Sequence, residues 1–171
     1  MCVSLGNVTP GAIGPAAGSQ ARILLVEDDP EAALFAITVL AKRGPFEVTH
    51  VADPAVALRL AAAGGWDLVL TDVEMPGMTG LELLDALRRI APALPVVVIT
   101  SHVNLRTAAL LRHADEFLTK PVRIDQLLAT ATALIGRAAG AAGQQERAAG
   151  AVGQQERAAG VVGQQEPATG R

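Results

Sequence analysis

The stretch DLVLTDVEMPGMTGLELL, residues 67–84, decides the fold because it joins an apolar strand, a polar loop and the start of a helix. Leu68-Val69-Leu70 is a short apolar run typical of strands that are covered on both faces. Asp72 follows this run, and Met75-Pro76-Gly77 has the composition of a tight turn. The leucines that follow Gly80 are spaced as on one helix face. We therefore predict a strand–loop–helix unit with Asp72 at the carboxyl end of its strand.

Similar units lie on both sides of this stretch. Asp29-Pro30 and Asp53-Pro54 each combine a helix N-cap with a proline at the first helical position. Strands are predicted at 23–26, 46–51, 68–70, 96–99 and 117–118, and helices after residues 29, 53 and 80, more weakly at 102–113, and from 124. Because strands and helices alternate, we expect an open parallel sheet with helices on both faces.

The chain divides into three parts. Residues 1–21 form a leader without charged side chains, and residues 22–137 form the α/β domain. Residues 138–171 form a low-complexity tail of ten-residue repeats such as AAGAAGQQER. We expect a flexible, disordered leader and a mostly disordered tail with a fraying helix just after residue 137, because each repeat has little surface to bury. The tail is either a neutral, solubilising segment or a binding segment for a partner.

Composition excludes several classes of protein. The 171 residues are 50% hydrophobic but only 2% aromatic, and the net charge is −3. A base-stacking surface and a basic footprint for nucleic acid are therefore not expected. The single cysteine, Cys2, excludes a disulfide framework and a cysteine-ligated zinc site. With no membrane-length apolar run and no secretory signal pattern, we expect a soluble, cytoplasmic protein.

Polar residues follow the predicted strands at the same end. They are Glu27-Asp28-Asp29, Asp72, Thr100-Ser101 and Lys120. Each alone is readily explained as a helix cap, loop residue or surface charge, and Asp29 before Pro30 is interpreted as a cap. Together they predict a convergent site, because the carboxyl ends of adjacent parallel strands share one edge of the sheet. Carboxylates without His or Cys favour Mg²⁺, and a hydroxyl and an ammonium beside them suit a phosphoryl group.

Four segments carry a resemblance to a known family. ILLVEDDP (23–30), DLVLTDVEMPGMTGLELL (67–84), PVVVITS (95–101) and DEFLTKPV (115–122) resemble the receiver domain of bacterial two-component response regulators. The resemblance covers residues 22 to about 137 and implies a flavodoxin-like, doubly wound α/β fold. That fold has a five-stranded parallel sheet of strand order 2-1-3-4-5.

The resemblance also implies residue roles around a magnesium ion. Asp72 matches the aspartate that is phosphorylated, and Glu27 and Asp28 match the acidic pair that holds Mg²⁺. The backbone carbonyl of Glu74 matches a further metal ligand. Asp28 is the expected direct ligand of the pair.

A second group of residues matches the switching elements of the family. Thr100 matches the hydroxyl residue that moves onto the phosphoryl group, and Lys120 matches the lysine that pairs with it. Phe117 matches the aromatic residue whose rotamer follows that movement. The Lys120–Pro121 bond is expected to be cis.

The implied function is that of a stand-alone phospho-acceptor in a two-component phosphorelay. Its phosphodonor would be a sensor histidine kinase or a histidine phosphotransfer protein, and its output a downstream protein target, with a homodimer as a possibility. Mg²⁺-dependent self-phosphorylation and self-dephosphorylation would be its only catalysis, so we do not expect an enzyme.

Two alternatives stay open. The separation of Thr100 and Lys120 is shorter than usual for the family, and His113-Ala114 replaces the usual Gly-Ala. Both departures favour a receiver-like binding module that works without phosphate. An aspartyl-phosphate hydrolase would need an aspartate two residues after Asp72, where this chain has Glu74.

Overall fold

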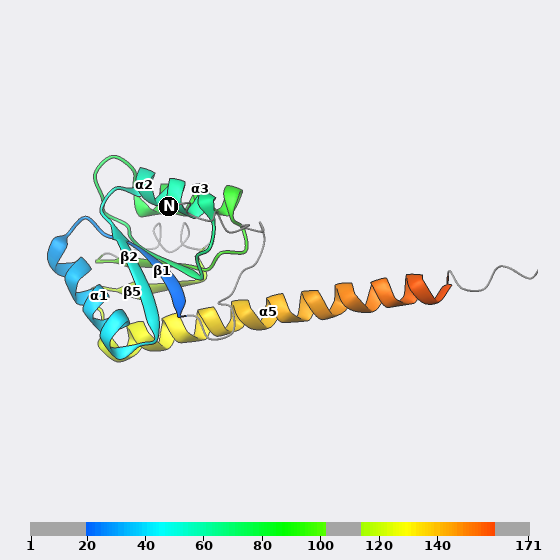
Figure 1. The fold of residues 1–171 in the computed structure, drawn as a ribbon. Coiled ribbons are helices and arrows are strands. Elements are labelled where there is room, and N and C mark those ends of the chain that lie inside the picture. Colours follow the sequence, from blue (N-terminus) through cyan, green and yellow to red (C-terminus); the bar gives the residue numbers. More distant parts are fainter. Residues whose placement is uncertain (1–19, 102–113, 160–171) are drawn as a thin grey trace, which may run out of the picture.

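The computed structural model describes residues 20–101 and 114–159 (Figure 1). In this part of the chain five strands form one sheet in the order β2-β1-β3-β4-β5, and all four neighbouring pairs are parallel. The strands are β1 (Ala21–Val26), β2 (Phe46–Val51), β3 (Leu68–Asp72), β4 (Val96–Thr100) and β5 (Glu116–Thr119). The predicted fold class and strand order are confirmed.

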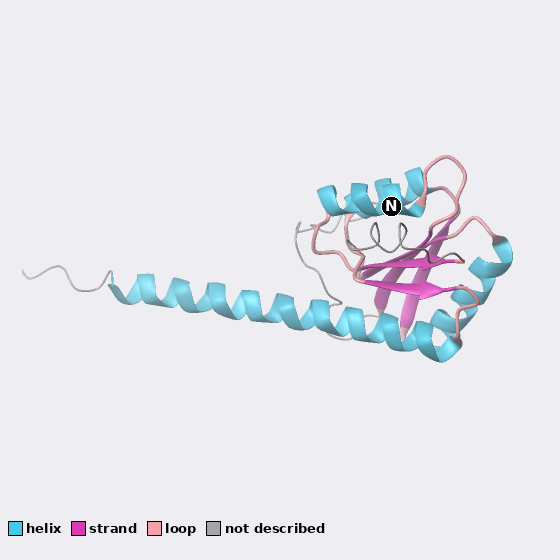
Figure 2. Ribbon diagram, turned by 180° about the vertical axis from the view of Figure 1, so that it is seen from behind, coloured by secondary structure: helices cyan, strands magenta, loops and turns pink. Residues whose placement is uncertain are grey.

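Helices cover both faces of this sheet (Figures 1 and 2). They are α1 (Pro30–Arg43), α2 (Pro54–Ala63), α3 (Gly80–Ile90) and α5 (Ile124–Ala159). One apolar core lies under α1 and α5, and a second lies under α2 and α3. Successive residues of β1 alternate between them, since Ile23 and Leu25 belong to the first core and Leu24 and Val26 to the second. This double burial explains the continuous apolar runs.

Local signals position the helices as the sequence predicts. The side chain of Asp29 accepts hydrogen bonds from the backbone N–H groups of Glu31 and Ala32, at 2.8 and 3.2 Å, and so caps α1. Asp53 caps α2 in the same way. Three leucines of α3 are buried, Leu83, Leu84 and Leu87, whereas Ile90 at the end of the helix is 48% exposed although its spacing continues the apolar face. The helix predicted at 102–113 and the leader up to residue 19 lie outside the described residues.

The last helix differs from the prediction in its length. The sequence predicts fraying just after residue 137 and a mostly disordered tail, whereas α5 continues to Ala159 and includes two of the ten-residue repeats. The repeats are rich in Ala, Gln, Glu and Arg, whose helix propensity offsets the cost of about 1 kcal/mol for each glycine. The distal part of α5 extends away from the sheet (Figure 1). Despite this length, no helix among the described residues is apolar enough to cross a membrane.

Candidate functional site

Three carboxylates meet at the carboxyl edge of the sheet. Glu27 and Asp28 follow β1 directly, and Asp72 is the last residue of β3. One oxygen of each lies within 4.8 Å of the others, and Glu27 and Asp72 are only 3% and 6% exposed. Oxygen ligands at this spacing suit a hard divalent cation. The predicted convergence of these three residues is therefore confirmed in the geometry.

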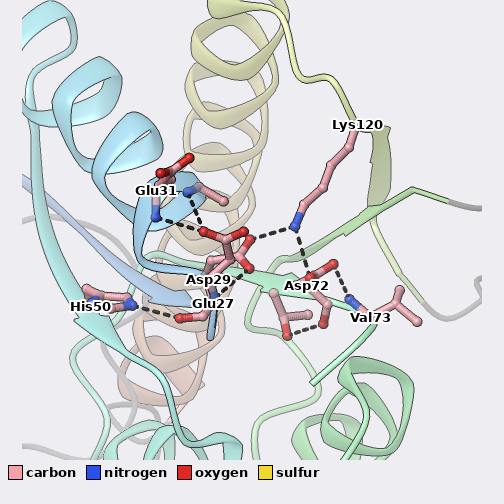
Figure 3. A network of polar contacts seen from close by, with 9 residues as sticks. Glu27, Asp29, Glu31, His50, Asp72, Val73 and Lys120 are labelled. Atoms are coloured by element: carbon pink, nitrogen blue, oxygen red, sulfur yellow. Dashed lines mark hydrogen bonds and ion pairs between the residues drawn. The ribbon is translucent and has the colours of Figure 1, made fainter. Parts of the chain in front are cut away.

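Lys120 joins the cluster from the loop after β5. Its Nζ donates to Oε2 of Glu27 and to Oδ2 of Asp72, each at 2.9 Å (Figure 3). The peptide bond that follows it, Lys120–Pro121, is cis, as expected. Ends of three strands thus supply two buried carboxylates and the ammonium that lies between them.

Burial and neighbouring charges change the pKa values of Glu27 and Lys120. Burial raises the pKa of Glu27 above its ordinary value, and although the hydrogen bond from Lys120 counteracts this, the negative charge of Asp72 adds to it. Burial also opposes the charge of Lys120, but its hydrogen bonds to Glu27 and Asp72 outweigh this and raise its pKa. Lys120 therefore stays protonated. A further positive charge beside Glu27 would stabilise the ionised form of its carboxyl group.

The backbone around Asp72 is held closely. Its Oδ1 accepts a hydrogen bond from the N–H of Val73 at 2.8 Å, and the carbonyl of Val73 accepts one from the N–H of Gly80 at 3.0 Å. A Cβ atom at Gly80 would collide with the carbonyl oxygen of Asp72. Glycine therefore lets the first turn of α3 pack directly against the end of β3. The loop between them turns at Gly77, whose φ of 81° favours glycine.

Contacts from β2 and from within the turn hold the acidic turn after β1. The N–H of Glu27 donates to the carbonyl of Val51 at 3.2 Å, and Oε1 of Glu27 accepts from the N–H of Asp29 at 3.3 Å. The ring of His50 contacts the carbonyl oxygen of Glu27 at 2.8 Å. Because the side chain of Asp29 caps α1, it lies outside the carboxylate cluster, as predicted.

Sequence reasoning missed His50. It is an exposed residue of an edge strand, 23 positions from Glu27, and no motif links the two. The only available signal is topological, because β2 is the neighbour of β1.

The remaining predicted residues lie around this cluster. Thr100 is buried at the end of β4, and its carbonyl accepts a hydrogen bond from the N–H of Lys120 at 2.9 Å. Phe117 on β5 is 43% exposed, and Glu74 is exposed in the loop after β3. Their switching and metal-binding roles stay predictions. His113 lies outside the described residues.

A family model described as the response regulator receiver domain matches residues 23–132. The chain belongs to this family. The matched segment contains the carboxylate cluster, Lys120, β1 from Ile23 onward and the whole of β2 to β5. The four resembling segments are thus part of one receiver domain, and the resemblance inferred from the sequence is confirmed.

Curated relatives extend beyond the receiver domain. The transcriptional regulatory protein TcrA of Mycobacterium tuberculosis is 38% identical over 121 residues, which cover 70% of this chain and 47% of TcrA. TctD of Salmonella typhimurium is 38% identical over 121 residues, covering 70% of this chain and 54% of TctD. The chain thus spans about half the length of these curated relatives.

Solved receiver domains have the same fold. The receiver domain of the Francisella response regulator 1452 aligns with a TM-score of 0.64 and 28% identity, covering 68% of this chain and 98% of that chain. TrrA of Thermotoga maritima, solved in complex with Mg²⁺-BeF, aligns with a TM-score of 0.62 and 29% identity, covering 67% of this chain and 98% of that one.

Proposed function

We propose that Asp72 of this receiver domain accepts a phosphoryl group from a phosphohistidine of a sensor histidine kinase or a histidine phosphotransfer protein. The observation that carries the proposal is the Lys120 ammonium, 2.9 Å from the Asp72 carboxylate in a cluster of three acidic residues. Phosphoryl transfer depends mainly on positioning and on neutralising the charge of the transferred group. This arrangement provides a positioned oxygen nucleophile with a fixed cation beside it.

The donor set fits Mg²⁺. Glu27, Asp28 and Asp72 offer carboxylate oxygens, and the backbone carbonyl of Glu74 would complete the protein ligands. Burial and the charge of Asp72 raise the pKa of Glu27, so a divalent cation bound beside it would stabilise its ionised form. A bound Mg²⁺ would supply positive charge opposite the transferred phosphoryl oxygens. The likeness to TrrA, whose structure contains Mg²⁺-BeF, supports this choice of metal.

The chain's own residues then have distinct tasks in the transfer. An oxygen of Asp72 forms the new P–O bond while the P–N bond to the donor histidine breaks, and the imidazole nitrogen keeps that electron pair. The N–H of Val73 orients the carboxylate of Asp72 throughout, because it donates to Oδ1 at 2.8 Å. Lys120, which donates a hydrogen bond to Oδ2 of Asp72, stabilises the negative charge of the phosphoryl group.

The phosphorylated form would signal through protein contact. The hydroxyl of Thr100 would move onto the phosphoryl group, and Phe117, now 43% exposed, would turn inward into the space that Thr100 leaves. The surface around β5 would then present a different face to a downstream protein or to a second copy of the chain. We assign the chain no enzymatic role beyond gaining and losing its own phosphoryl group, and we place it in the cytoplasm.

Mass spectrometry of the intact protein tests the proposal. We expect incubation with acetyl phosphate and Mg²⁺ to add one phosphoryl group to the parent protein and to Asp85→Asn, which changes an exposed acid on α3. Asp72→Ala should gain none, and chelation of Mg²⁺ should prevent the gain in the parent. Equal labelling of Asp72→Ala and the parent would refute the assignment. A parent that gains no phosphoryl group and binds no Mg²⁺ would favour the phosphate-independent binding module.

A further inference from the structure

His50 contacts the acidic turn from the edge of the sheet. It lies on β2, and its Nε2 is 2.8 Å from the carbonyl oxygen of Glu27 (Figure 3). A carbonyl oxygen can only accept a hydrogen bond, so Nε2 must carry the proton. His50 is therefore a donor to the backbone of the turn and leaves the side chains of Glu27 and Asp28 in the carboxylate cluster.

This contact lies where the backbone pairing of β1 and β2 ends. The last paired residues are Val26 and Val51, and the N–H of Glu27 still donates to the carbonyl of Val51. The carbonyl of Glu27 lies beyond this last backbone hydrogen bond, and it accepts a hydrogen bond from the side chain of His50 instead of from a backbone N–H. The N–H and the carbonyl of Glu27 are thus both hydrogen-bonded to β2, the N–H to the backbone of Val51 and the carbonyl to the imidazole of His50.

The carbonyl of Glu27 belongs to the peptide group that joins Glu27 to Asp28. Rotation of this planar group changes the ψ angle of Glu27 and the φ angle of Asp28, and so shifts the backbone that carries the Asp28 side chain. The Glu27 side chain has its own anchors in Lys120 and the N–H of Asp29, whereas Asp28 is exposed. The hydrogen bond from His50 is therefore well placed to determine where the Asp28 carboxylate lies.

We propose that His50 is a positioning residue of the magnesium site, which holds the peptide group between Glu27 and Asp28 so that the Asp28 carboxylate faces the metal. This inference rests on the proposed function, because it takes Asp28 as a Mg²⁺ ligand. His50 itself contacts no metal in this proposal and acts only through the backbone of Glu27. A side chain able to donate from the same position should replace it.

Calorimetric titration with Mg²⁺ tests this role. We expect His50→Leu to weaken Mg²⁺ binding about threefold to tenfold, as loss of one neutral hydrogen bond implies. His50→Gln should recover most of the affinity, because its amide nitrogen can donate from the position of Nε2. Glu47→Gln is the control, since Glu47 is an exposed residue at the opposite end of the same strand.

Amide spectra of the metal-free proteins separate positioning from metal binding. In ¹H–¹⁵N spectra we expect His50→Leu to shift the Asp28 and Asp29 signals, and His50→Gln to shift them less. Unchanged Mg²⁺ affinity in His50→Leu, or equal weakening by Leu and Gln, would overturn the proposal. If the parent binds no Mg²⁺, the proposed function fails first and this inference with it, whereas normal parent binding with no effect of His50 refutes only the inference.

Discussion

Replacing Gly80 by alanine should test whether the close packing of α3 against the end of β3 requires glycine. Helix propensity alone predicts that alanine stabilises the protein, whereas the packing predicts that it destabilises it. A Cβ atom at this position would overlap the carbonyl oxygen of Asp72 and lie 2.8 Å from its carbonyl carbon. Both atoms belong to the backbone, so rotation of a side chain cannot relieve the contact. Either α3 must move away from the sheet or the peptide after Asp72 must tilt.

The expected cost follows from two opposing effects. Overpacking of a close contact destabilises a protein by about 1–3 kcal/mol, and the gain in helix propensity from glycine to alanine is at most about 1 kcal/mol. Gly80 is the first residue of α3, where this gain is smallest. We therefore expect Gly80→Ala to lower the free energy of unfolding by about 2 kcal/mol.

Gly136 provides a matched control within α5. It is exposed, and nothing lies within 4 Å of the position that its Cβ would take. Gly136→Ala should therefore raise the free energy of unfolding by about 0.5–1 kcal/mol, through helix propensity alone. The same chemical change is thus expected to have opposite signs at the two sites.

Urea unfolding followed by the fluorescence of Trp66 measures both variants. Trp66 is the single tryptophan of the chain and is 7% exposed, so its emission reports the loss of the core. The slope of the unfolding free energy against urea should be unchanged, so that the midpoints compare stability directly. A Gly80→Ala protein as stable as the parent, or a change of the same sign at both glycines, would refute the packing argument.

Three further predictions concern charged groups. Lys120→Met should lower the stability of the metal-free protein at pH 7 by about 2 kcal/mol, because paired carboxylates lose their cation, and Mg²⁺ should restore part of it in urea titrations. Since burial raises the folded pKa of Glu27 above its ordinary value of 4.5, its contribution to stability is fully present below pH 4.5 and is lost as pH rises through the folded pKa. The urea midpoint of the metal-free parent should therefore fall as pH rises through this range, and the midpoint of Glu27→Gln should not. The same pH dependence of the midpoint in both proteins would contradict the raised pKa of Glu27. Asp115→Ala should cost about 1–3 kcal/mol in thermal or urea unfolding, because Asp115 pairs with Arg88 at 2.6 Å and accepts from the N–H of Val96 at 2.7 Å.

The sheet could be predicted because its determinants are local. The run Val96–Ile99 is apolar at every position and is buried at every position, as expected for a strand covered on both faces. Asp29 and Asp53 precede prolines and cap the helices that follow. Given parallel strands, the side chains of Asp28, Asp72 and Lys120 could meet only at one edge.

Other features depend on contacts that a sequence pattern does not contain. His50 follows another polar residue, Thr49, in an edge strand, and its partner is a carbonyl group that follows another strand. The apolar spacing of α3 includes Ile90, but the helix passes the end of the core there and leaves that side chain exposed. The low burial of the repeats predicts disorder, but helix propensity acts without burial, and α5 continues through two of them.

The repeats within α5 also have a geometric consequence. Each ten-residue unit adds about 15 Å to a helix and turns its end by about 80° relative to a whole number of turns. Gain or loss of a single unit would therefore move the far end of α5 along the helix axis and rotate its side chains about that axis, while the receiver domain stays unchanged. A change in repeat number would therefore alter the reach and the orientation of α5 together, in steps fixed by the geometry of the helix.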